Sequence, residues 1–138
     1  YGHLAQVSSW IFHYLPEVHW CGFYLWSPAE KELILGPYQG RPACLRIHPN
    51  RGVCGKAFRE KRPLNISNVH DIPGHIACDH LTLSELVIPL KNEEKNFGVL
   101  DLDSYEENRF SDRDLKELTR IMDQVTKTLF RDSDFLFQ

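Results

Sequence analysis

The feature that most constrains the fold is a pair of alternating segments joined by a short polar turn. Apolar side chains recur at every second position from Leu83 to Lys91, and after residues 92–96 the pattern resumes from Phe97 to Asp103. Side chains that repeat with period two point to opposite faces of a strand. The segments therefore predict an antiparallel hairpin whose core face carries Leu86, Ile88, Leu90, Leu100 and Leu102.

Other segments predict the elements around this hairpin. Apolar residues at three- and four-residue steps predict a helix over residues 3–15, and further helices are expected from Gly52 to about Glu60 and after Ser111. The breaker-rich segment Gly36–Pro42 is read as a loop. Additional strands are expected at His19–Trp26, Glu32–Leu35, Ala43–Ile47 and Pro63–Ile66. The pattern indicates one α+β domain, residues 1–138, with a mostly antiparallel sheet flanked by helices.

The composition excludes several classes of partner. The formal net charge of -3 gives no electrostatic reason to expect nucleic acid or an anionic membrane. No apolar run approaches the roughly 18 residues needed to span a bilayer. The first residue is Tyr1 rather than Met, so we expect the N-terminus to be truncated. Four cysteines without a CxxC pair indicate a reducing compartment, and we expect the cytoplasm.

Acidic side chains gather at one end of the predicted hairpin. Asp101 and Asp103 are two residues apart, so they share one face of their strand with Phe97 and Val99, and Glu85 is expected to lie opposite or diagonal to Asp103. If the first strand is a neighbour, Trp20 and Tyr24 lie on the same face. One interpretation is a solvated sheet end. The other is a pocket for a small cation with an apolar tail, in which crowding raises the pKa of at least one acid.

The four cysteines differ in their sequence context. Cys21 lies on the core side of its strand and is expected to be a buried, inert thiol. Cys54 lies near the start of a predicted helix, where the helix dipole favours a thiolate. Cys78 lies in the segment from Val69 to His80, which reads as a functional loop. It fits a redox thiol, a packing or surface residue, or a zinc ligand with partners drawn from His70, His75, His80, Cys44 and Cys54.

Five motifs together indicate a family. They are Gly36–Cys44 (GPYQGRPAC), Gly52–Gly55 (GVCG), Gly74–Asp79 (GHIACD), Ser84–Glu85 and Gly98–Ser104 (GVLDLDS). In this order, and with this spacing of the cysteines, the chain resembles the GAF-domain free methionine-(R)-sulfoxide reductases over about residues 18–130.

The resemblance implies a reaction and a set of roles. The family reduces the R epimer of free methionine sulfoxide and not protein-bound residues. Cys78 matches the nucleophile, Cys44 the main resolving thiol, and Cys54 a further redox-active or assisting thiol. Glu85, Asp101 and Asp103 match residues that hold and protonate the substrate, and Trp20 matches a tryptophan at its methyl-sulfur end. The resemblance also implies thioredoxin as the reductant and a homodimer.

Chemical reasoning adds to these roles. The substrate ammonium suits a carboxylate cluster, and Tyr24 is expected to line the same pocket. Backbone N–H groups around Ile76, Ala77 and Cys78 are expected to bind the substrate carboxylate. Glu85 in its neutral form is a plausible general acid for the departing oxygen, and no metal or organic cofactor is required. The alternatives are a non-catalytic GAF module that senses a small ligand, such as a cyclic nucleotide, and a zinc-stabilised interaction domain.

Overall fold

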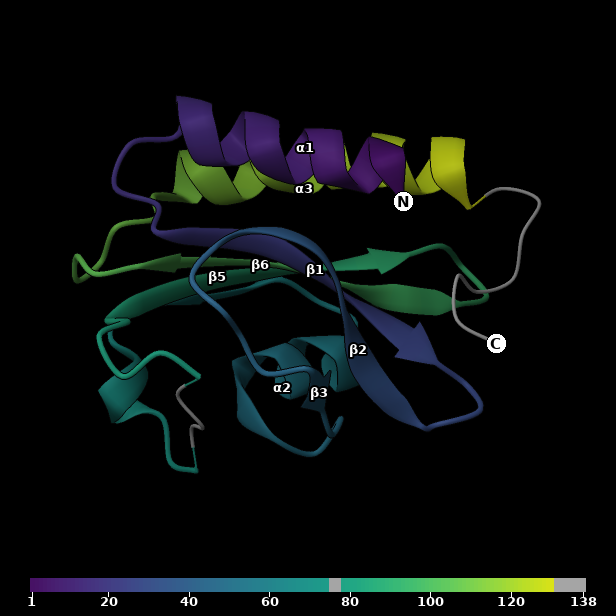
Figure 1. Cartoon of the computed structure of the whole chain (residues 1–138), viewed down its shortest axis with the longest axis horizontal. Coiled ribbons are helices and arrows are strands. Elements are labelled where there is room, and N and C mark those ends of the chain that lie inside the picture. The colour runs from purple at the N-terminus through teal and green to yellow at the C-terminus, as the bar shows by residue number, and fades with distance from the viewer. Residues whose placement is uncertain (75–77, 131–138) are drawn as a thin grey trace.

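The predicted hairpin forms part of the central sheet. In the computed structural model, which describes residues 1–74 and 78–130, β5 (Ser84–Lys91) pairs antiparallel with β6 (Asn96–Ser104) (Figure 1). Glu85 lies directly opposite Asp103, and Ile88 lies opposite Leu100. This register confirms the expected faces of the hairpin, because Leu86, Ile88, Leu90, Leu100 and Leu102 are all buried in one core cluster.

Four further strands complete the sheet. They are β1 (Trp20–Ser27), β2 (Glu32–Gly40), β3 (Arg46–Ile47) and β4 (Leu64–Ile66). Within the described residues, the sheet has the order β3-β2-β1-β6-β5-β4, and every neighbouring pair is antiparallel. The α+β architecture predicted from the sequence is thus confirmed. Because β1 pairs with β6, the first strand is a neighbour of the acidic strand, as the pocket interpretation requires.

Helices cover both faces of the sheet. Helices α1 (Gly2–Tyr14) and α3 (Asp112–Leu129) lie on one face, and α2 (Gly52–Glu60) lies on the other (Figure 1). The α1/α3 side holds the larger apolar cluster, with Phe23 and Leu100 fully buried. The α2 side holds a smaller cluster that includes Tyr24 and Val99. Since α2 leaves part of its face uncovered, this side has room for a cavity.

Two predicted boundaries were wrong. Segment Gly36–Pro42 was expected to be a loop, but β2 continues to Gly40. The register moves from Gly22 opposite Tyr38 to Tyr24 opposite Leu35, so Phe23 faces both Gly36 and Pro37 in a β-bulge. A bulge accommodates proline and glycine inside a strand, which explains why breakers do not end β2.

The strand expected at Ala43–Ile47 contains only Arg46 and Ile47, so Cys44 precedes β3. Its backbone is instead held by a side chain, because the Tyr24 hydroxyl donates a hydrogen bond to the Cys44 carbonyl at 2.9 Å.

Phe97 was also placed on the wrong face. It belongs to the α1/α3 core and stacks on Phe130 at 4.5 Å, whereas Val99 lies on the α2 side. The pairing shifts between Leu90 and Lys91, and Gly98 has a positive φ of 150°. This irregularity breaks the period-two alternation, because one extra residue moves the preceding side chain to the other face.

The start of α3 is fixed by a capping box. Ser111 accepts a hydrogen bond from the Asp114 backbone, and the Asp114 side chain accepts one from the Ser111 backbone, which confirms the predicted start of α3. Among the described residues, none of the helices is long and apolar enough to cross a membrane.

Candidate active site

A cavity of about 510 Å³ opens on the α2 side of the sheet. Its walls come from strands β1, β5 and β6, from the connection that carries Cys44, from the first turn of α2 and from the loop that precedes β5. Eight residues singled out from the sequence line it together: Trp20, Tyr24, Cys44, Cys54, Cys78, Glu85, Asp101 and Asp103. The folded chain therefore unites elements that are far apart in the sequence.

The three acids lie at the base of this cavity on adjacent strands. Glu85 is opposite Asp103 across β5 and β6, and Trp20 is opposite Asp103 across β1 and β6. Glu85 and Asp101 are each only 5% exposed. A solvated sheet end would leave such groups in water, so the burial contradicts that interpretation and supports the pocket.

Burial changes the proton affinity of this acidic cluster, defined as Glu85, Asp101 and Asp103. Desolvation and the neighbouring charges of Asp101 and Asp103 raise the pKa of Glu85 well above its ordinary value. Burial and Asp101 raise the pKa of Asp103 in the same way. Burial also raises the pKa of Asp101, but hydrogen bonds from Glu85, Cys54 and Asp103 oppose this rise. We therefore assign the negative charge of the cluster to Asp101 and a retained proton to Glu85.

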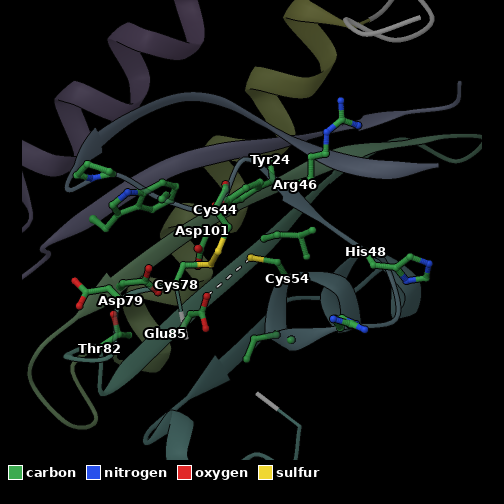
Figure 2. A pocket seen from close by; sticks show the side chains of 18 of the residues that line it. Tyr24, Cys44, Arg46, His48, Cys54, Cys78, Asp79, Thr82, Glu85 and Asp101 are labelled. Carbon is green, nitrogen blue, oxygen red and sulfur yellow. Dashed lines mark hydrogen bonds between the residues drawn. A yellow bond between two sulfur atoms is a disulfide. The ribbon is translucent and has the colours of Figure 1, made fainter. Parts of the chain in front are cut away.

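The cysteines fall into two groups. Cys44 and Cys78 form a disulfide with a Cα–Cα distance of 5.6 Å, at the cavity wall (Figure 2). Cys78 is exposed and Cys44 is half-buried. Cys21 and Cys54 are free and buried. Cys21 lies in the α1/α3 core, and burial raises its pKa strongly, so the prediction of a buried, inert thiol is confirmed.

The expectation of a thiolate at Cys54 is wrong. The residue is indeed in the first turn of α2, but burial raises its pKa well above the ordinary value, and Asp101 and Glu85 raise it further. The Cys54 Sγ lies 3.9 Å from Glu85 Oε2, in the orientation of a thiol donating to a carboxyl oxygen (Figure 2). Desolvation and two nearby acids outweigh the helix dipole at this position.

Aromatic side chains form the wall beside the acids. Trp20 stacks on Tyr38 at 5.3 Å and on Tyr24 at 5.9 Å, and its Nε1 donates to the Arg41 carbonyl at 3.0 Å. A Cβ at Gly22 would lie 2.3 Å from the Tyr38 Cβ and 2.7 Å from the Trp20 ring. Glycine is therefore required at this position for the indole to pack against Tyr38.

Sequence reasoning did not predict a hydrogen bond between Tyr105 and Asp79, which holds the segment that carries Cys78. The Tyr105 hydroxyl donates to Asp79 Oδ2 at 2.6 Å, and the Leu81 amide donates to Asp79 Oδ1 at 3.0 Å. Tyr105 in turn stacks on His19 at 4.1 Å. Although burial opposes it, the bond from Tyr105 helps to lower the pKa of Asp79, so the carboxylate is charged. No sequence periodicity links these residues, because tertiary structure alone brings them together.

Part of the prediction cannot be placed. His75, Ile76 and Ala77 lie outside the described residues. His70 and His80 are exposed and do not line the cavity, and the Cys78 sulfur is bonded to Cys44. The zinc site proposed around Cys78 and these histidines therefore has no assembled ligand set in the described part of the chain.

Comparison with known proteins defines first a class and then a family. A family model described as the GAF domain matches residues 5–129. The free methionine-R-sulfoxide reductase of Escherichia coli is 42% identical over 91% of this chain and 75% of that protein. The chain belongs to the GAF-domain family of free methionine-R-sulfoxide reductases.

Solved structures agree with this assignment. The structure of fRMsr of Staphylococcus aureus in complex with substrate has a TM-score of 0.86 and 41% identity, covering 93% of this chain and 82% of that one. The free methionine-R-sulfoxide reductase of Neisseria meningitidis, in complex with its substrate, has a TM-score of 0.89 and 35% identity, covering 94% of this chain and 77% of that one.

Proposed function

We propose that this protein reduces free methionine (R)-sulfoxide to methionine, with Cys78 as the nucleophile and Cys44 as the resolving thiol. The observation that carries the proposal is one cavity lined by both the Cys44–Cys78 disulfide and the buried acidic cluster. A two-electron reduction needs a pair of thiols that can form a disulfide, and a sulfoxide oxygen leaves only with a proton. Both requirements are met by residues that share this cavity.

The first step transfers oxygen from the substrate to the enzyme. The Cys78 sulfur attacks the sulfoxide sulfur while Glu85 protonates the oxygen. Methionine departs, and Cys78 is left as a sulfenic acid, so the substrate sulfur gains two electrons and the Cys78 sulfur loses them. The raised pKa of Glu85 keeps its proton available near neutral pH.

The second step removes the oxygen as water. The Cys44 thiol condenses with the Cys78 sulfenic acid, which forms the disulfide and releases one water molecule. An external dithiol then reduces this disulfide, and we propose thioredoxin in that role. Support comes from the exposure of Cys78, since a protein reductant must reach one of the two sulfur atoms. Cys54, which is buried, is proposed as an assisting thiol only.

The cavity suits both ends of the substrate. We place the ammonium group against Asp101 and Asp103 and the methyl-sulfur end against Trp20, with Tyr24 completing the wall. The backbone N–H groups of Ile76, Ala77 and Cys78 remain the proposed partners of the substrate carboxylate. We further propose a cytoplasmic homodimer, which sedimentation of the purified protein would test.

A coupled assay tests the proposed activity. NADPH oxidation through thioredoxin reductase and thioredoxin is followed with each separated epimer of free methionine sulfoxide. We expect turnover with the R epimer and little with the S epimer or with a protein-bound sulfoxide. Equal rates with both epimers, or no turnover with the R epimer, would refute the proposal.

Variants separate the roles of the two thiols. Cys78→Ser is expected to abolish even a single stoichiometric turnover. Cys44→Ser should release one methionine per chain and then stop, because no disulfide forms for thioredoxin to reduce. Cys21→Ala is the matched control, since this thiol is buried on the opposite side of the sheet. Normal turnover by Cys78→Ser would show that the nucleophile is assigned wrongly.

A further inference from the structure

Cys54 and two acids place three potential metal-binding atoms close together. The Cys54 sulfur and one oxygen each of Glu85 and Asp101 all lie within 4.8 Å of one another. The separation of Cys54 Sγ and Glu85 Oε2 is 3.9 Å. Figure 2 shows these side chains pointing toward one another from α2, β5 and β6. The disulfide engages Cys44 and Cys78, so this group is distinct from the redox pair.

Two of these three side chains also carry an oxygen atom without a hydrogen-bond partner in the described part of the chain. Glu85 Oε1 and Asp101 Oδ1 are buried without a hydrogen-bond partner among the described residues, and both side chains are 5% exposed. A buried polar atom left unsatisfied destabilises the folded chain, because it has lost its hydrogen bonds to water. Two such oxygens that face one cavity indicate that the protein is built to receive a positively charged group there.

The donor set selects the kind of cation. Calcium and magnesium prefer six or more oxygen ligands, whereas a thiolate with two carboxylates suits zinc or cadmium. Tetrahedral zinc places sulfur and oxygen ligands roughly 3.5 Å apart, given bond lengths of about 2.3 Å and 2.0 Å. The observed 3.9 Å therefore needs only a small inward movement of the Cys54 and Glu85 side chains.

We propose that Cys54, Glu85 and Asp101 form a binding site for one zinc-like divalent cation, with the fourth coordination position open to the cavity. Binding releases the thiol proton of Cys54 and the carboxyl proton of Glu85 to solvent. It leaves the redox state of all four cysteines unchanged.

A functional consequence rests on the proposed reductase activity. The cation occupies the place of the substrate ammonium and removes the proton that Glu85 would donate. Zinc is thus expected to compete with the sulfoxide and to stop reduction reversibly, with recovery on addition of a chelator.

The test uses the oxidised protein, because the Cys44–Cys78 disulfide leaves only Cys21 and Cys54 as thiols. Cobalt(II) is titrated as the spectroscopic probe, and zinc is then added to displace it. We expect one equivalent of cobalt per chain with a sulfur-to-metal charge-transfer absorption in the near ultraviolet. Zinc should abolish that absorption, and calcium or magnesium in excess should not.

Matched variants identify the ligands. Cys54→Ser should lose the absorption and bind zinc at least about tenfold more weakly. Mutation of a residue that only hydrogen-bonds to a metal ligand already lowers metal affinity by about 10–100-fold. Cys21→Ala should retain both properties, because this thiol lies in the α1/α3 core. If Cys54→Ser does not fold, Glu85→Gln provides the test, and the zinc affinity should fall in the same way.

The proposal is overturned by no cobalt binding, by an absorption that survives Cys54→Ser, or by a zinc affinity unchanged in Glu85→Gln. None of these measurements requires turnover. A protein that binds zinc through Cys54 but reduces no sulfoxide would refute the proposed function and leave the metal site intact, and the reverse result would refute the metal site alone.

Discussion

At the scale of single residues, the proposed chemistry depends on the different proton affinities within the acidic cluster. Asp101 accepts hydrogen bonds from its neighbours, whereas burial and neighbouring charge raise the pKa values of Glu85 and Asp103 well above their ordinary range. One buried anion beside protonated acids offers both a partner for an ammonium and a proton for an oxygen. Carboxylates exposed to water at a sheet end would be charged, so they could bind an ammonium but could not donate a proton to the oxygen.

Replacing Glu85 should remove the proposed proton donor. Because its pKa is raised, the side chain is protonated near neutral pH and loses its proton at higher pH. We expect kcat/KM for the R epimer to fall as pH rises through that pKa, and Glu85→Gln to lower kcat by about 10²–10⁴-fold, the usual contribution of general acid catalysis. Glu117→Gln on α3 serves as the exposed control. A pH profile and rate unchanged in Glu85→Gln would exclude the role.

Asp103 is expected to lower the free energy of unfolding at high pH, where its buried carboxyl group loses its proton. A carboxyl group whose pKa is higher in the folded chain binds more protons when folded, so it stabilises below its unfolded pKa of about 3.9. That stability is lost as pH rises through the raised folded pKa. Asp103→Asn should therefore raise the free energy of unfolding by about 1–3 kcal/mol at pH 8 and by less at pH 5.

Chemical denaturation at both pH values measures this effect, with the exposed Asp123→Asn as the control. The same Asp103→Asn variant is expected to bind the substrate more weakly, so stability and activity change in opposite directions. A variant less stable than the wild type at pH 8 would contradict the assignment.

At the scale of elements, period-two alternation was enough to predict the hairpin and its core face, while the register was left open between Glu85 opposite and Glu85 diagonal to Asp103. It failed where the backbone departs from regularity. The bulge at Phe23 admits Gly36 and Pro37 into β2, and the irregularity near Gly98 turns Phe97 toward the helices. Breaker residues and alternation are local signals, and neither reports how a partner strand absorbs an extra residue.

The hydrogen bond between Tyr105 and Asp79 also joins two elements, since it fixes the segment that carries Cys78 to the connection after β6. The Tyr105–Asp79 hydrogen bond is present in the structure that contains the disulfide. Loss of the Tyr105 hydroxyl should therefore destabilise the oxidised form of the protein. Hydrogen bonds to charged groups contribute about 1.5–3 kcal/mol, and about 1.4 kcal/mol is a factor of ten, so Tyr105→Phe should weaken the Cys44–Cys78 disulfide by roughly 10- to 100-fold.

Equilibration with a glutathione buffer of known ratio measures that change as the oxidised fraction of the pair. Tyr14→Phe is the control, because Tyr14 is exposed on α1. An oxidised fraction that is the same in Tyr105→Phe and the wild type would show that the Tyr105–Asp79 hydrogen bond does not position Cys78.

At the scale of the whole molecule, the sheet separates two functions. Its α1/α3 face is a packed apolar core, and its α2 face bears the cavity. Alternation predicted the faces of the residues in β1, β5 and β6 correctly except for Phe97. The pairing of Cys44 with Cys78 did not follow from local patterns, since 34 residues separate them and three thiols were candidates; the family resemblance implied it. The Tyr105–Asp79 hydrogen bond followed neither from a local pattern nor from the family resemblance.

The most direct test of the account is to map the thiols after one turnover. Fully reduced protein is incubated with free methionine (R)-sulfoxide and without a reductant, then alkylated and examined by peptide mass spectrometry. The account predicts about one methionine released per chain, Cys44 linked to Cys78, and Cys21 and Cys54 still free. Methionine formed without a Cys44–Cys78 disulfide, or four thiols retained after exposure to the sulfoxide, would contradict it.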